Sequence, residues 1–174
     1  KQGAELAIAE INANGGIRGS ELKLEYFDTQ LNPTEAANLA RTVVADERFP
    51  LLIGPWSSSS CFAALPILEE AGMVLWTPSA SSAQIAESPW GFKVSVDNQV
   101  YGSLMADLAT NELGFEKIAL ISAQNDFGLN QKSPQQAVAE SFEAMVVADE
   151  EFTPDTTDFR PILSKINESG AEAI

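Results

Sequence analysis

Apolar and polar residues alternate in short blocks along this chain of 174 residues, and the spacing within each block predicts its secondary structure. Apolar side chains recur three or four positions apart over residues 4–11, which predicts an amphipathic helix ending at Asn14-Gly15-Gly16. Apolar and charged residues alternate over residues 22–26, which predicts a half-exposed strand. Asn32-Pro33 favours the start of a second helix. The expected buried stripe of that helix is Ala36, Ala40, Val43 and Val44.

The middle of the chain alternates short apolar strands with helices. Residues 51–53 are wholly apolar, which predicts a strand buried on both faces of a parallel sheet. The run Ser57–Ser60 leads into a helix, and Pro66 is expected to kink this helix or confine it to a short first segment. Residues 73–76 and 92–96 predict two further strands.

The helix and strand pattern restarts after Asp97, with a helix over roughly residues 98–111 and a strand over residues 117–121. In this helix, the residues that we expect to face inward are Tyr101, Leu104, Met105 and Leu108. Ser133-Pro134 predicts the start of another helix. The residues expected to be buried by that helix are Val138 and Phe142.

The last part of the chain predicts a strand over residues 145–152, a helix capped by Asp158 and the start of a strand at Ala173-Ile174. Strands that alternate with helices imply parallel sheets with helices on both faces, an α/β fold. Because the pattern restarts, we expect two lobes, residues 1–96 and residues 97–174, with a crossover near Val96-Asp97.

Net charge and apolar run length limit the partners of the chain. The net charge is −15, from 25 acidic and 10 basic residues, which disfavours nucleic acid and anionic lipid surfaces. No apolar run approaches the ~20 residues of a membrane-spanning helix, so we expect no direct membrane insertion. Lys1 opens directly into a helical pattern, and an export signal removed during maturation is compatible with this.

A single cysteine, Cys61, and the absence of histidine limit the chemistry further. These two facts exclude zinc sites of the usual kind and histidine-dependent catalytic triads. Asp28 and Asp126 have no evident partner in the sequence, so we interpret both as loop caps. We therefore predict no catalytic residue, no metal site and no cofactor.

Two serine-rich loops are the candidate ligand site. They span Trp56–Ser60 and Thr77–Ser82, and each follows an apolar strand. Ligands of open parallel sheets lie beyond the carboxyl ends of the strands, and the first loop also meets a helix N-terminus, which attracts anions. Serine hydroxyls both donate and accept, so two such loops are suited to a zwitterion. The alternative, that these serines are ordinary helix caps, stays open.

Six segments, spread in order over the chain, carry a resemblance to a known family: Gly3–Gly19, Asn32-Pro33, Ile53-Gly54-Pro55 with the serine run, Leu65–Gly72, Thr77–Ser81 and Thr157-Asp158-Phe159. They resemble the Leu/Ile/Val-binding protein family, the type I periplasmic solute-binding proteins of ABC importers. The resemblance implies an α/β fold of two doubly wound parallel-sheet lobes, of which the chain lacks the first strand and the remainder of the second lobe.

The resemblance also implies the site. Ser58 would hold a ligand carboxylate, while the backbone of Ser79 and Ala80 and the hydroxyl of Ser81 would serve the ammonium and carboxylate groups. The residues expected to line the pocket for the ligand's side chain are Trp56 and Phe127. Family members often have an aliphatic residue and Tyr at these two positions, and many have Thr in place of Ser81. We therefore expect ligands other than simple branched aliphatics, although a core position for Trp56 is an open alternative.

The function implied by the resemblance is that of a periplasmic or extracytoplasmic binder, not an enzyme, which delivers an amino acid or related small carboxylate to a membrane permease of an ABC importer. A ligand-sensing domain of a receptor or regulator with the same fold is the alternative. A flavodoxin-like or dehydrogenase-like enzyme would need a glycine-rich loop directly after a strand, whereas Gly15–Gly19 follows a helix.

Overall fold

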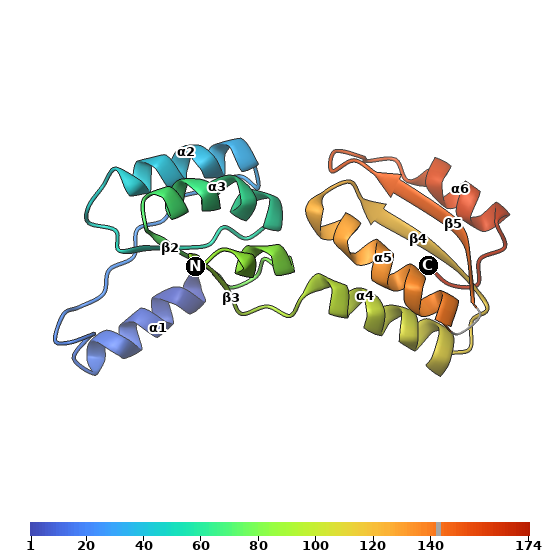
Figure 1. Ribbon diagram of the computed structural model, residues 1–174, viewed down its shortest axis with the longest axis horizontal. Helices are drawn as coiled ribbons and strands as arrows, with labels where there is room; N and C mark the ends of the chain where they lie inside the picture. The colour runs from blue at the N-terminus through green and yellow to red at the C-terminus, as the bar shows by residue number, and fades with distance from the viewer. Residues whose placement is uncertain (142–143) are drawn as a thin grey trace.

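The computed structural model describes residues 1–141 and 144–174 and contains two separate parallel sheets (Figure 1). The strands are β1 (Leu51–Ile53), β2 (Val74–Thr77), β3 (Gly91–Lys93), β4 (Lys117–Ala123) and β5 (Met145–Phe152). One sheet has the order β1-β2-β3, and β4 pairs with β5 in the other. The prediction that residues 51–53 and residues 117–121 lie in different sheets is confirmed.

Helices occupy most of the chain between the strands. The α-helices are α1 (Gln2–Ala13), α2 (Pro33–Val44), α3 (Ser58–Glu70), α4 (Asn98–Asp107), α5 (Asp126–Ser141) and α6 (Arg160–Glu168). A 3-10 helix, η1 (Ala83–Glu87), precedes β3, and a π-helical turn, η2 (Leu108–Glu112), extends α4. The predicted capping of α2 is confirmed, because Oδ1 of Asn32 accepts hydrogen bonds from the amides of Thr34 (2.8 Å) and Glu35 (3.2 Å).

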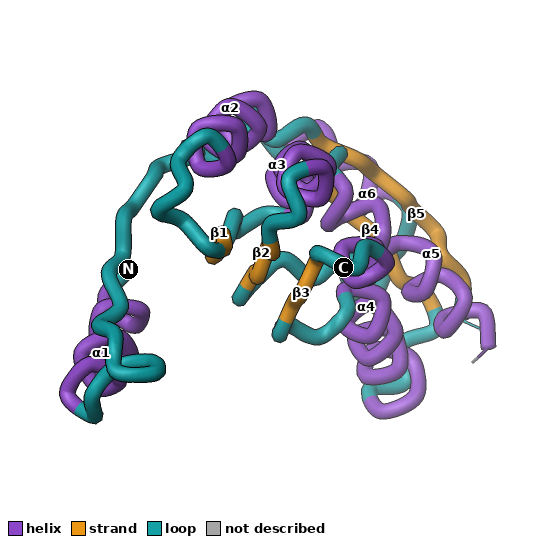
Figure 2. The backbone as a smooth tube through the Cα atoms, turned by 60° about the vertical axis from the view of Figure 1, so that its left-hand side comes forward, coloured by secondary structure: helices purple, strands orange, loops and turns teal. Residues whose placement is uncertain are grey.

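Helices α2 and α3 pack against each other on one side of β1–β3, while α1 lies apart from them (Figure 2). The buried cluster beneath them comprises Ala40, Cys61, Ala64, Leu65, Leu68, Leu75, Ala80 and Ile85. A second, separate cluster beneath the other sheet comprises Ile118, Leu120, Ala139 and Ala144. Each sheet therefore has its own core. Because Ala80 belongs both to the first core and to the second serine loop, this loop is anchored to that core.

Three predictions for the first sheet differ from the structure. Residues 21–29 are extended but form no ladder, because no strand lies beside them among the described residues, and a strand exists only by pairing. Leu51 and Ile53 are exposed rather than buried, because α2 and α3 cover only one face of β1. The strand predicted over residues 92–96 is shorter in the structure, where β3 ends at Lys93.

The prediction of which α4 residues face inward is wrong as well. The large apolar side chains Tyr101, Leu104, Met105 and Leu108 are 43–60% exposed. Small residues of the same helix, Gly102 and Ala106, are buried instead, and α4 lies side by side with α5 (Figure 1). Small side chains allow two helix backbones to approach closely, and this packing outweighs the pattern of large apolar residues.

Two helix boundaries also differ from the sequence analysis. Helix α3 continues through Pro66 to Glu70, so the helix is not confined to a short first segment. Helix α5 begins at Asp126 and not at Ser133-Pro134, because Oδ1 of Asn125 accepts a hydrogen bond from the amide of Gly128 (2.9 Å) and caps the helix there. The predicted burial of Phe142 and Val138 falls outside the residues and side chains that the structure describes.

Candidate ligand-binding site

The two serine-rich loops lie side by side at the carboxyl ends of β1 and β2. The strands run parallel with Ile53 opposite Trp76, so both end at the same edge of the sheet. The amide of Gly54 continues this pairing by donating to the carbonyl of Trp76 (2.9 Å). This edge is where open parallel sheets bind their ligands.

Side-chain hydrogen bonds join the two loops to each other. Thr77 Oγ1 donates to the carbonyl of Pro55 (2.8 Å), and Ser79 Oγ donates to the carbonyl of Trp56 (3.0 Å). Thr77 also accepts from the amide of Ala80 (3.2 Å) and is fully buried. No role for Thr77 was predicted from the sequence. A polar residue at the end of an apolar strand does, however, indicate a buried side chain that needs hydrogen-bond partners. These bonds hold the loops in one fixed arrangement.

The first loop ends at the start of α3. Ser57 caps this helix, since its Oγ accepts from the amide of Ser60 (3.2 Å) and its carbonyl accepts from the amide of Cys61 (3.0 Å). The amides of Ser58 and Ser59 come before these first bonds, and such amides point beyond the helix end. The start of α3 therefore offers two N–H donors and the positive end of a helix dipole, a favourable place for an anion.

Two buried serine hydroxyls adjoin this helix start. Ser58 is 3% exposed, and its Oγ accepts a hydrogen bond from the amide of Ser82 (3.3 Å), while its own proton has no acceptor among the described residues. Ser81 is 4% exposed, and its Oγ has no hydrogen-bond partner among the described residues. A buried hydroxyl without a partner costs about 1–3 kcal/mol, so a ligand that reaches Ser81 gains a ready hydrogen bond.

Backbone groups of the second loop already make hydrogen bonds within the protein. The amide of Ala80 donates to Thr77, and its carbonyl accepts from Ser95 Oγ (2.5 Å). The carbonyl oxygen keeps one further lone pair, which suits an ammonium group. Ala80 is therefore suited to a ligand through its carbonyl rather than through its amide.

Trp56 and Phe127 occupy exposed positions beside these loops. Trp56 is 71% exposed, which rules out the alternative that it packs in the core. Phe127 is 47% exposed and lies in the first turn of α5, in the part of the chain that holds the second sheet. The structure thus leaves both aromatic side chains accessible to a ligand.

The interpretation of Asp126 as a loop cap is wrong, because the hydrogen-bond partner of its side chain is 67 positions away in the chain. Its Oδ2 accepts a hydrogen bond from Ser59 Oγ (2.5 Å), so the start of α5 is joined to the start of α3. The interpretation of Asp28 as a loop cap is confirmed, since its Oδ1 accepts from the amide of Gln30 (2.8 Å).

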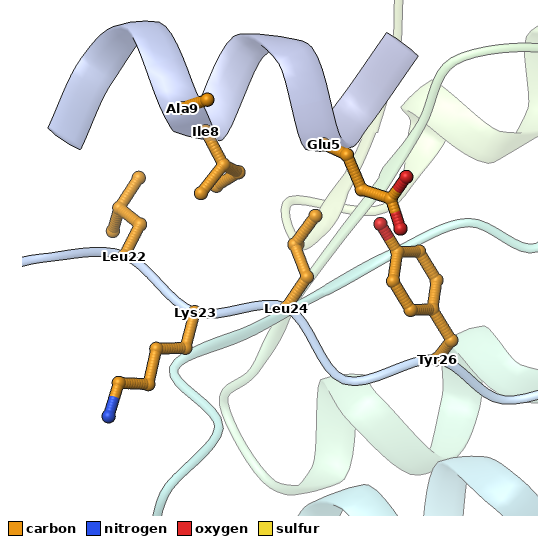
Figure 3. Close-up of a pocket in the computed structure, with 7 residues that line it drawn as sticks. All are labelled: Glu5, Ile8, Ala9, Leu22, Lys23, Leu24 and Tyr26. Atoms are coloured by element: carbon orange, nitrogen blue, oxygen red, sulfur yellow. The ribbon is translucent and has the colours of Figure 1, made fainter. Parts of the chain in front are cut away.

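A hollow lies away from the serine loops, between α1 and the extended segment that follows it (Figure 3). Its lining is mostly apolar, and in Figure 3 the hydroxyl of Tyr26 points toward the carboxylate of Glu5. Partial desolvation, together with Glu5, raises the pKa of Tyr26. None of the predicted site residues lines this hollow.

Cys61 lies beneath the first loop, and we expect its thiol to be unreactive in the folded protein. It is fully buried, its Sγ donates to the carbonyl of Pro55 (3.5 Å), and burial raises the pKa of the thiol to about 11. Only about one thiol in a thousand is then ionised at pH 8, and the thiolate is the reactive form. Alkylation followed by peptide mapping should label Cys61 only after unfolding in denaturant. Rapid labelling of the native protein would contradict this packing.

The part of the chain that the structure describes holds no cluster of three or more histidine, cysteine or acidic residues suited to a metal ion. The same residues include no helix with both the length and the apolar character of a membrane span.

Comparison with known proteins identifies the family. The family model for periplasmic binding proteins matches residues 1–174. The chain belongs to this periplasmic binding protein family. An amino acid binding protein from Pseudomonas aeruginosa is 29% identical over 175 residues, which cover 99% of this chain and 47% of that protein. The Leu/Ile/Val-binding protein of Escherichia coli is 26% identical, with 99% of this chain and 47% of that protein covered.

A solved relative shares the fold of the described residues. It is the branched-chain amino acid transporter substrate binding protein from Streptococcus pneumoniae, in complex with isoleucine, with a TM-score of 0.86 and 28% identity. The match covers 95% of this chain and 47% of that one, so the chain spans about half the length of the relatives it matches. The predicted resemblance to Leu/Ile/Val-binding proteins and the predicted type I periplasmic binding fold are confirmed.

Proposed function

We propose that the chain is part of the extracytoplasmic substrate-binding component of an ABC importer, which binds an amino acid or related small carboxylate and presents it to a membrane permease. The ligand lies between two lobes, residues 1–96 and residues 97–174. The family consists of binding proteins, which supports a role in binding rather than in catalysis.

One observation carries this proposal, namely that the loop with Ser81 is bonded to the start of α3, through the hydrogen bond from the amide of Ser82 to Ser58 Oγ. The Ser81 hydroxyl is buried without a partner among the described residues, and the neighbouring helix start offers the amides of Ser58 and Ser59. A carboxylate satisfies both, because it accepts several hydrogen bonds and carries the charge that a helix N-terminus favours. The carbonyl of Ala80 is an acceptor for the ammonium group of the same ligand.

The names of the relatives support an amino acid as the ligand. The Escherichia coli relative is named for leucine, isoleucine and valine, and the Streptococcus pneumoniae structure holds isoleucine. For this chain we propose a different preference among side chains. Trp56 and Phe127 offer flat aromatic faces, which can stack on an aromatic ring or lie over a cation.

Replacing Trp56 by Leu should change the order of preference among ligands while leaving stability nearly unchanged. Stacking and cation–π contacts contribute about 0.5–2 kcal/mol, which is enough to reorder similar ligands. The measurement is a titration of the full-length protein with aliphatic, aromatic and cationic amino acids. Trp90→Leu is the matched control, because Trp90 packs against Gly72 beyond the far end of α3. The same rank order in wild type and Trp56→Leu would contradict a role for Trp56.

Native mass spectrometry of the full-length protein tests the proposed function. We expect the protein as purified, or after unfolding, refolding and incubation with a mixture of the standard amino acids, to carry one additional small molecule. Denaturation should release this molecule, and its mass should correspond to an amino acid or related carboxylate. Failure to retain any carboxylate-bearing compound from the mixture would contradict the proposal.

A further inference from the structure

The segment that links β3 to α4 is bonded to the second serine loop along its length. The amide of Val94 donates to the carbonyl of Thr77 (3.3 Å), and Ser95 Oγ donates to the carbonyl of Ala80. Lys93, whose side chain is 8% exposed, braces the same segment, with its Nζ 2.5 Å from Asp97 Oδ1 and 2.7 Å from the carbonyl of Ser95. The link and the loop therefore form one rigid unit.

Asn98 extends this unit to the second sheet. Its amide donates to the carbonyl of Ser81 (3.0 Å), and its side-chain amide donates to the carbonyl of Phe127 (3.3 Å). Asn98 is 1% exposed, so water does not compete for these bonds. One residue thereby touches the backbone of two candidate ligand residues, one beside each sheet.

A second connection lies at the starts of two helices. Ser59 is in the first turn of α3 and Asp126 in the first turn of α5, and the hydroxyl of Ser59 donates to the carboxylate of Asp126 (2.5 Å). Both residues are half-buried, and a hydrogen bond to a carboxylate is stronger than one between neutral groups. Each member of the pair is the chain neighbour of a candidate ligand residue, Ser58 or Phe127.

The position of α5 is what brings Asp126 within reach. Gly128 is buried against the end of β4, where an added Cβ would lie 2.3 Å from the carbonyl oxygen of Ala123. The close approach of helix and strand fixes the first turn of α5, and Asp126 with it. The geometry of the Ser59–Asp126 pair is therefore set by the packing of α5 against β4.

We infer that Ser59, Asp126 and Asn98 are positioning residues that hold the start of α5, and with it Phe127, against the serine loops. This inference rests on the proposed function for its consequence, a higher ligand affinity. The Ser59–Asp126 pair acts as a latch between the two halves, and Asn98 acts at the link. None of the three residues needs to touch the ligand.

The experiment measures the distance between the two halves in the ligand-free, full-length protein. Spin labels are placed at the exposed positions of Glu70→Cys in α3 and Glu112→Cys in η2, and electron double resonance gives their distance distribution. Buried Cys61 stays unlabelled. We expect Ser59→Ala and Asp126→Asn each to move the distribution from the wild-type distance to longer distances. Loss of a hydrogen bond to a charged group predicts a change of about tenfold or more in the ratio of closed to open forms.

Two variants separate a latch from a general effect on stability. Ser164→Ala is the matched control, because it removes a hydroxyl–carboxylate bond, to Glu168 Oε1 (3.2 Å), that stays within α6. It should leave the distance unchanged, whereas Ser59→Thr, which keeps a hydroxyl, should restore the wild-type distribution. Identical distributions in wild type, Ser59→Ala and Asp126→Asn would overturn the inference. Because no ligand is present, this outcome is independent of whether any amino acid binds.

Discussion

Replacing Ser58 by Ala should weaken ligand binding by about 1.5–3 kcal/mol, a loss of roughly 10- to 150-fold in affinity. The reason is that the Ser58 hydroxyl, whose proton has no acceptor in the part of the chain that the structure describes, lies at the helix start where the ligand carboxylate is expected. Calorimetry of the full-length protein, with the amino acid that the wild type binds most tightly, measures the change. Ser81→Ala should have an effect in the same direction.

A stability measurement is needed beside this titration, because Ser58 also accepts a hydrogen bond from the amide of Ser82. Losing that bond should lower the free energy of unfolding by about 1 kcal/mol, which leaves a folded protein for the titration. Ser164→Ala serves as the control for the substitution itself, since Ser164 lies in α6, away from the serine loops. Wild-type affinity in a folded Ser58→Ala variant would remove Ser58 from the site.

Replacing Gly128 by Ala should lower the free energy of unfolding by about 1–3 kcal/mol, the usual range for overpacking. The added Cβ would lie 2.3 Å from the carbonyl oxygen and 2.8 Å from the amide nitrogen of Ala123, and neither backbone atom can yield without moving β4 or α5. Chemical denaturation of the full-length protein measures this change. Ligand affinity should fall as well, because α5 carries Asp126 and Phe127.

Gly3→Ala is the matched control for this prediction. Gly3 lies in α1 with nothing within 4 Å of an added Cβ, so Ala should leave stability unchanged or raise it by up to about 1 kcal/mol through helix propensity. Equal stability for Gly128→Ala and Gly3→Ala would show that α5 does not approach β4 as closely as the structure indicates.

Local sequence signals were enough to predict where the two serine-rich loops lie in the fold. Asn32 and Ser57 begin α2 and α3 as capping residues should, and apolar strands end directly before polar loops. Parallel pairing of β1 and β2 then places the two loops at one edge of a sheet. The placement of the loops could be predicted because the caps and strand ends depend on neighbours in the chain, while the binding role of the loops stays a prediction.

Where the prediction failed, packing between distant segments decided the structure. The α4 helix buries Gly102 and Ala106 against α5 because close helix approach needs small side chains, and the sequence pattern favours large ones. The Ser59–Asp126 bond joins residues 67 positions apart, so no local pattern indicates it. The start of α5 was within reach of sequence analysis, because Asn125 is a favourable cap directly before Asp126.

The central claim is that the chain binds a small molecule through its carboxylate, and the most direct test compares free amino acids with their methyl esters. Both are titrated calorimetrically into the full-length protein, and each pair shares the same side chain and ammonium group. The serine loops and the start of α3 predict that at least one free amino acid binds and that its methyl ester, which lacks the carboxylate charge, binds at least about tenfold more weakly. Equal affinity for an amino acid and its ester, or no binding by any free amino acid, would contradict the account.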